Sequence, residues 1–157
     1  MPEEDELKTK ILAEMTVDHS DALEKNYALA KQFMRITKEG KVDVIVKDRV
    51  GGTDKIALYL IGKRYAKRAD LATTEYVKNI ELCNELGIIQ NSLLPWLKTL
   101  RDSNIVVPGE RDGNESQHTI ALNAVERTLK DISKKLKGAK SEEKPEAVDT
   151  NNDTTGV

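Results

Sequence analysis

The chain has 157 residues, enough for one domain with its own hydrophobic core and polar ends. Charged residues make up 33% and hydrophobic residues 38%, and no apolar run reaches the roughly 18 residues of a membrane-spanning helix, so we expect no membrane partner. The acidic first segment lacks an apolar signal sequence and the chain has one cysteine, which together favour a cytoplasmic protein.

Charge is segregated along the chain although the net charge is only -2. Residues 1–24 contain 8 acidic and 2 basic side chains, and residues 138–157 contain 5 acidic and 2 basic ones. The middle, residues 25–137, has 21 basic and 14 acidic side chains, a net charge of +7. A basic body between acidic ends is typical of a protein that binds nucleic acid. The simpler alternative is that the charges lie on solvated helix faces and that the acidic ends only aid solubility.

An amphipathic helix is predicted over residues 4–15. It begins with acidic residues, which suit the positive end of a helix, and its apolar residues recur at helical spacing at Leu7, Ile11, Leu12 and Met15. Such a stripe packs either on its own chain, which is the more economical alternative, or against a second copy. We predict a homodimer.

A longer helix and a short strand are predicted next. The helix covers residues 20–38 and ends before Gly40, because glycine suits the left-handed residue that follows a helix. The alternating, β-branched segment 42–47 predicts a strand, and "VGGT" interrupts the chain after it. Residues 1–50 are therefore assigned to an N-terminal helical extension with a short strand.

Three further helices are predicted from Thr53 onward. The first begins at Thr53 and contains "DKIALYLIGKRYAKRA". The second covers residues 80–86 and ends at Gly87, which supplies a left-handed turn without Cβ strain. The third begins with Asn91 or Ser92 as its N-cap.

Two strands, a helix and a tail complete the chain. "NIVVPGE" and "SQHTIAL" predict a β-hairpin with its turn at Asp112-Gly113, and residues 123–136 predict an amphipathic helix. These elements belong to the domain 53–137. From residue 138 the composition is polar and acidic, so residues 138–157 are predicted to be a disordered tail.

The order of these elements is that of a winged helix-turn-helix. The segment "KIALYLIGKRYAKRADLATTEYVKNIELCNELGIIQNSLLPWLKTLRDSNIV" resembles archaeal winged-helix DNA-binding proteins. The resemblance implies a mainly α fold with a small β-hairpin wing and with additional N- and C-terminal helices. It also implies binding to double-stranded DNA, as a transcriptional regulator or a chromatin-associated factor.

The predicted second helix of the helix-turn-helix offers few side chains that read bases. Gln90, Asn91 and Ser92 lie at its leading end, where polar groups reach bases or phosphate, but such residues are equally favoured as turn and cap residues. Lys98 and Arg101 are its basic residues near the outward face. An acidic neighbour on the same face weakens sequence-specific reading.

Other candidate phosphate contacts lie outside this helix. Lys63, Arg64 and Lys67 form stripes at helical spacing, and Arg111 is the basic residue at the predicted wing tip. For the first three, complementing the dipole at a helix C-terminus is the simpler explanation.

A protein-interaction module is the alternative function. Leu94, Pro95 and Trp96 would form an apolar patch for a protein partner, provided that Trp96 is exposed. No spacing of histidine and cysteine suits zinc, no glycine-rich phosphate loop has its lysine, and no catalytic triad stands out. We therefore expect no enzyme activity, no catalytic residue, no metal and no cofactor.

Overall fold

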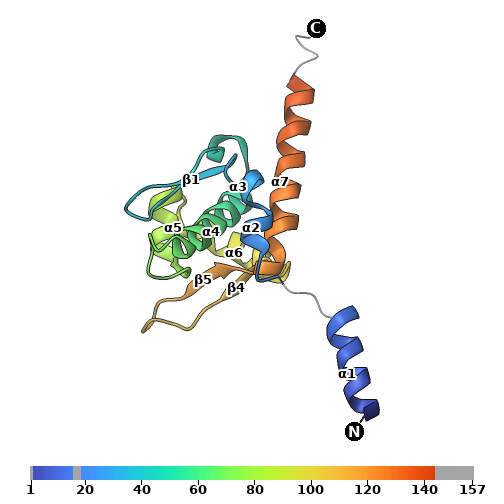
Figure 1. Ribbon diagram of the computed structural model, residues 1–157. Coiled ribbons are helices and arrows are strands. Elements are labelled where there is room, and N and C mark those ends of the chain that lie inside the picture. Colours follow the sequence, from blue (N-terminus) through green and yellow to red (C-terminus); the bar gives the residue numbers. More distant parts are fainter. Residues whose placement is uncertain (1, 16–18, 144–157) are drawn as a thin grey trace.

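The computed structural model describes residues 2–15 and 19–143. The protein is mainly helical and has two small antiparallel sheets (Figure 1). The elements are α1 (Pro2–Glu14), α2 (Ala22–Lys25), α3 (Tyr27–Ala30), β1 (Met34–Ile36), β2 (Val42–Val44), the 3-10 turn Lys47–Arg49, α4 (Gly52–Arg68), β3 (Val77–Lys78), α5 (Asn79–Leu86), α6 (Gln90–Asp102), β4 (Val106–Pro108), β5 (Gln117–Ile120) and α7 (Leu122–Glu143). Within the described part of the chain, no helix is both long and apolar enough to cross a membrane.

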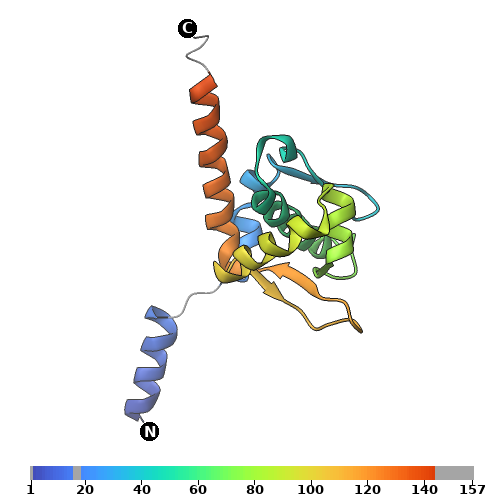
Figure 2. The same ribbon diagram turned by 180° about the vertical axis from the view of Figure 1, so that it is seen from behind.

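The first predicted helix is confirmed as α1, but its apolar stripe does not pack on the body. Leu7, Ile11 and Met15 are 59%, 38% and 77% exposed. Both views show α1 standing apart from the other elements (Figure 1 and Figure 2). The more economical alternative, burial of this stripe on its own chain, is therefore not what the structure shows.

The long helix predicted over residues 20–38 is wrong. Two single-turn helices, α2 and α3, occupy its first half, and the chain then enters β1, which pairs antiparallel with β2 and places Met34 opposite Val44. Gly40 is not the end of a helix: it lies in the turn of this hairpin with φ +86°. The strand predicted over residues 42–47 is confirmed in its first half, as β2.

Helix α4 lies at the centre of the core. All six residues from Ile56 to Ile61 are at most 1% exposed, so this part of the helix is buried on every side. It contacts β1 and β2 as well as α5, α6, β5 and α7. The residues before and after the predicted boundary at residue 50 consequently share one hydrophobic core.

A three-stranded sheet has the order β3-β5-β4, with antiparallel pairing throughout. The predicted β4–β5 hairpin is confirmed. Its two turn residues are Gly113 and Asn114, one position later than predicted, because Asp112 and Glu115 exchange both of their backbone hydrogen bonds. Gly113 takes the positive φ (+65°) that such a turn requires.

Helix α7 confirms the helix predicted over residues 123–136 and continues beyond it. Its inward residues Val125, Leu129 and Ile132 are at most 1% exposed. The helix reaches Glu143 and projects past the rest of the body (Figure 1). The first residues of the tail predicted from residue 138 are therefore helical, and residues 144–157 lie outside the described residues.

Candidate nucleic-acid interface

Helices α5 and α6 meet at a tight turn that depends on one glycine. Gly87 follows α5 with a left-handed backbone (φ +66°, ψ +37°), as the sequence predicts. Its amide and the amide of Ile88 both donate to the carbonyl oxygen of Cys83, which satisfies the end of α5. Since glycine has no Cβ, the turn forms without strain and sets the angle between the two helices.

One apolar face holds α6 to the body. Leu93, Leu97 and Leu100 are 0%, 1% and 4% exposed and belong to the core that α4 and α5 also line. Their spacing places them on one side of the helix and leaves the other side to solvent. Figure 2 shows α6, in yellow, on the near side of the body. The exposed residues of α6 are Gln90, Asn91, Leu94, Pro95, Lys98, Thr99, Arg101 and Asp102.

The leading end of α6 begins earlier than predicted. Ile89 precedes the first helical residue and makes no side-chain cap bond, so Asn91 and Ser92 lie inside the first turn and do not cap it. Gln90 and Asn91 are exposed there, and Ser92 is half-buried. The first amides of any helix lack acceptors within the helix, so this end presents N–H donors together with two exposed side-chain amides.

Pro95 lies in the second turn of α6, because the helix begins at Gln90. It has no N–H to donate, so the carbonyl oxygen of Asn91 loses its usual intrahelical partner. The hydroxyl of Thr99 donates to the carbonyl oxygen of Pro95 over 3.1 Å. Helix α6 tolerates this proline because the buried leucines anchor it. The carbonyl oxygen of Asn91 consequently stays available as an acceptor near the start of the helix.

The two basic residues of α6 differ in whether an acidic side chain pairs with them. Lys98 Nζ lies 2.9 Å from Asp102 Oδ2, so an acid on the same helix offsets its charge. The Arg101 side chain is exposed and enters no ion pair within residues 2–15 and 19–143. Arg101 is thus the more available cation on this face.

At the tip of the β4–β5 hairpin, Arg111 is exposed but engaged. Its guanidinium donates to Ser116 Oγ over 3.2 Å and to the carbonyl oxygen of Asn114. These bonds hold the arginine against its own turn. The guanidinium N–H groups that bind Ser116 and Asn114 therefore stabilise the hairpin. A phosphate that binds Arg111 would compete with these two hydrogen bonds.

Lys78, which the sequence did not single out, offsets the acids of the hairpin. Its Nζ lies 2.7 Å from Asp112 Oδ2 and 2.9 Å from Glu115 Oε1. The hydrogen bonds to these two carboxylates hold the pKa of Lys78 well above its usual range. Two acids of the hairpin, Asp112 and Glu115, are therefore paired, while Glu110 is exposed. No local pattern could reveal a partner so distant in sequence.

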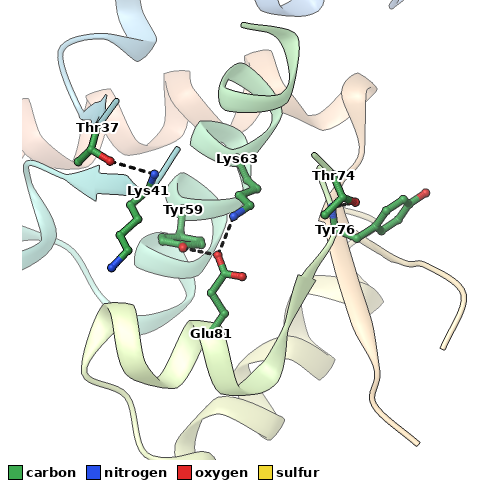
Figure 3. A network of polar contacts seen from close by, with 7 residues as sticks. All are labelled: Thr37, Lys41, Tyr59, Lys63, Thr74, Tyr76 and Glu81. Atoms are coloured by element: carbon green, nitrogen blue, oxygen red, sulfur yellow. Dashed lines mark hydrogen bonds and ion pairs between the residues drawn. The ribbon is translucent and has the colours of Figure 1, made fainter. Parts of the chain in front are cut away.

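Two of the predicted phosphate contacts are turned into the protein. The Lys63 side chain is 13% exposed, and its Nζ lies 2.9 Å from Glu81 Oε2, which also accepts a hydrogen bond from the Tyr59 hydroxyl (Figure 3). Arg64 Nε donates to the carbonyl oxygen of Ile120 over 2.9 Å. These cations join α4 to α5 and to β5, and their side chains are only 13% and 19% exposed.

Lys67 keeps an exposed side chain, but on α4 and not on α6. It lines a hollow of about 370 Å³ with Arg68, Asp70 and Glu75, where acids and bases alternate. The structure therefore brings together Gln90, Asn91, Lys98 and Arg101 on one helix. It leaves Lys67 on a different element.

Trp96 is half-buried and packs against the core. Its ring lies so close to Gly52 that a side chain at that position would overlap it. Of the predicted apolar patch, only Leu94, at 46% exposed, and Pro95 face solvent. Because Trp96 is half-buried, it offers a partner only part of its ring, and the protein-interaction module stays a prediction.

Among the described residues, no group of three or more histidine, cysteine, aspartate and glutamate side chains is placed to hold a metal ion. Protein-family models, curated proteins and solved structures show no match to this chain. The resemblance to archaeal winged-helix proteins therefore remains a prediction from the amino-acid sequence.

Proposed function

We propose that α4 to β5 form a winged helix-turn-helix that binds double-stranded DNA, and that the protein acts as a transcriptional regulator or a chromatin-associated factor. The observation that carries the proposal is the arrangement around α6. The helix follows a glycine turn, is anchored by three leucines, and precedes a hairpin whose second strand lies between β3 and β4. An exposed second helix of this kind enters the major groove in helix-turn-helix proteins.

The charges on α6 favour contacts with the DNA backbone over extensive base reading. Arg101 is an exposed cation, whereas Lys98 shares its charge with Asp102. The leading end of α6 adds N–H donors that suit a phosphate. We therefore assign most of the affinity to a few phosphate contacts, each contributing about -0.9 to the slope of log K against log salt concentration.

A modest sequence preference would come from the side-chain amides of Gln90 and Asn91. Both are exposed in the first turn of α6. Amide side chains recognise adenine through paired hydrogen bonds to its major-groove edge. We therefore expect any preference to favour adenine opposite the leading end of α6.

The test is fluorescence anisotropy with a labelled random-sequence duplex, titrated with the protein at several salt concentrations. We expect an affinity that falls steeply as salt rises. Arg101→Ala should weaken binding and make the salt slope shallower by about 1, because one phosphate contact is lost. Lys134→Ala removes the same charge from an exposed position on α7 and should leave the slope nearly unchanged.

Two outcomes would count against the proposal. A protein that does not bind the duplex at low salt has no electrostatic contact with DNA, and the proposal fails. If Arg101→Ala and Lys134→Ala reduce the affinity and the slope equally, general positive charge carries the binding and α6 has no special part in it.

A further inference from the structure

We propose that α1 of one chain docks in an apolar groove on the body of a second copy, so that two chains exchange their N-terminal helices. This assembly is independent of the proposed DNA binding. Neither α6 nor the β4–β5 hairpin contributes to the groove, which is formed by α2, α3, β1 and α4.

The groove consists of two adjoining hollows of about 300 Å³ each, which share Tyr27 and Tyr65. The Tyr27 ring is 56% exposed, and its centroid lies 6.3 Å from that of Tyr65 in a tilted arrangement. Leu23 lines one hollow, and Met34 and Ile36 line the other. Leu23 and Met34 are 6% and 4% exposed and form the floor, while Tyr27 is exposed and Ile36 and Tyr65 are half-buried along the sides. The groove is thus apolar at its base, as at binding grooves for an apolar helix face.

The rim of the groove has three basic side chains, Lys31, Arg35 and Arg68, and one acidic side chain, Glu24. Lys31 Nζ lies 5.2 Å from the centre of the Tyr27 ring and enters no ion pair in the described part of the chain. Arg35 and Arg68 have acidic partners, but both pairs are largely exposed and so contribute little. An occupant with an apolar face and a negative charge fits this surface.

Helix α1 has this chemistry. Leu7, Ile11 and Met15 follow one another at four-residue spacing and are exposed. Residues 2–14 contain five acidic and two basic side chains, so the segment is negative where the groove is positive. The apolar stripe and the charge of α1 therefore both complement the groove.

A second copy is the occupant because α1 covers none of the groove on its own chain, and both views show it standing apart (Figure 1 and Figure 2). Leu23, at one end of the groove, is only eight residues beyond Met15, so docking in cis would require the chain to reverse within that connection. In a two-fold exchange, each chain gives its helix and receives its partner's, and the same contact is made twice.

The first experiment is sedimentation velocity and light scattering on the full chain over a wide concentration range. We expect twice the chain mass of 17.5 kDa. Ile11→Glu places a charge in the stripe and should weaken the dimer at least tenfold. Ala13→Glu adds the same charge two residues on, on the opposite side of the helix, and should leave the dimer intact.

A mixing experiment distinguishes exchange between chains from docking within one chain. Tyr27→Glu blocks the groove but keeps α1, whereas Ile11→Glu blocks α1 but keeps the groove. Each variant alone should be monomeric, and the two together should form a heterodimer through one intact docking contact. Lys31→Glu replaces Tyr27→Glu if the latter fails to fold by circular dichroism, since Lys31 is exposed.

Three results would overturn the inference. They are a wild-type chain that stays monomeric at every concentration, a dimer that Ile11→Glu leaves unchanged, and complementary variants that do not associate when mixed. The first and third would also be the outcome if α1 folded back on its own chain. DNA binding is measured separately, so its failure and the failure of the dimer are distinguishable.

Discussion

At the scale of single residues, Glu81 connects two helices through a small polar network. Its Oε2 accepts a hydrogen bond from the Tyr59 hydroxyl and lies 2.9 Å from Lys63 Nζ (Figure 3). Burial, and then the hydrogen bond to Glu81, raise the pKa of Tyr59 far above its usual value, so the phenol remains a donor. Lys63 therefore serves the contact between α4 and α5.

Replacing Lys63 should reduce stability and leave DNA affinity unchanged. Lys63→Met removes the cation and leaves the half-buried Glu81 carboxylate without it, which should lower the free energy of unfolding by about 1–3 kcal/mol in urea titrations. Lys98→Met breaks an exposed pair as its control and should cost less than about 1 kcal/mol. Equal losses in the two variants would contradict a structural role for Lys63.

His118 is a buried histidine with one unsatisfied nitrogen. It is 2% exposed, its Nε2 lies 2.7 Å from Asn79 Oδ1, and its Nδ1 has no hydrogen-bond partner in the described part of the chain. Because an amide oxygen only accepts, we assign the ring hydrogen to Nε2. A further proton would go to Nδ1 and leave a buried charge without an acceptor.

The pH dependence of stability should therefore report on His118. Burial, and then the charge of Arg101, lower the pKa of His118 to about 4, below the value of roughly 6.5 for an unfolded histidine. The unfolded chain binds the proton first, so this contribution to stability is complete above about pH 6.5. It is lost as the pH falls toward 4, by at most about 1.4 kcal/mol per pH unit.

Urea unfolding at a series of pH values between 7 and 4 measures this effect, with His118→Gln as the comparison. Carboxylates titrate in both proteins, so the difference between them isolates the histidine. The wild type should lose more stability than His118→Gln across this range. Parallel curves would show that His118 does not titrate as its burial requires.

At the scale of elements, local signals predicted the helices and the hairpin that surround α6. The spacing of Leu93, Leu97 and Leu100 and the position of Gly87 define α6 and its turn without reference to the rest of the chain. The β1–β2 hairpin was missed because Met34 also fits a helical apolar pattern. Its strand partner, Val44, is ten residues away, and strands of three residues are too short to show alternation.

The candidate site was harder to predict because side-chain partners are distant in sequence. Lys63 pairs with Glu81, 18 residues away, and Arg64 donates to a carbonyl oxygen 56 residues away. Helical spacing groups these basic residues on α4, but it does not reveal which of them face a neighbouring element. By contrast, the exposure of Asn91 and Lys98 follows directly from the inward leucines of α6, because both lie on the opposite side of the helix.

Gly87, in the turn between α5 and α6, should be required for its backbone conformation alone and not for lack of space around it. A Cβ at this position would meet no atom within 4 Å, yet φ is +66°. Gly87→Ala should therefore lower the free energy of unfolding by about 1 kcal/mol. Gly138 is equally open but lies within α7 without a positive φ, so Gly138→Ala should show no such loss in the same urea titrations. Equal effects would refute the conformational origin.

At the scale of the whole molecule, the charge available for a partner is smaller than the sequence suggests. The net +7 of residues 25–137 includes Lys63, Arg64 and Lys78, whose side chains contact other parts of the same chain. We therefore expect moderate rather than tight DNA binding by a single copy. In the proposed dimer, two copies of α6 would act together, with the separation of the half-sites set by the two-fold axis.

Trp96 gives the molecule an intrinsic optical probe. It is the only tryptophan, and its ring lies against Gly52, where α4 begins, while its backbone belongs to α6. Its fluorescence emission therefore reports on the packing of α6 against α4. Exposure of the indole to water shifts this emission to longer wavelength. Since the ring lies on the inner side of α6, a spectral change on adding DNA would record movement of the helix and not contact with the bases.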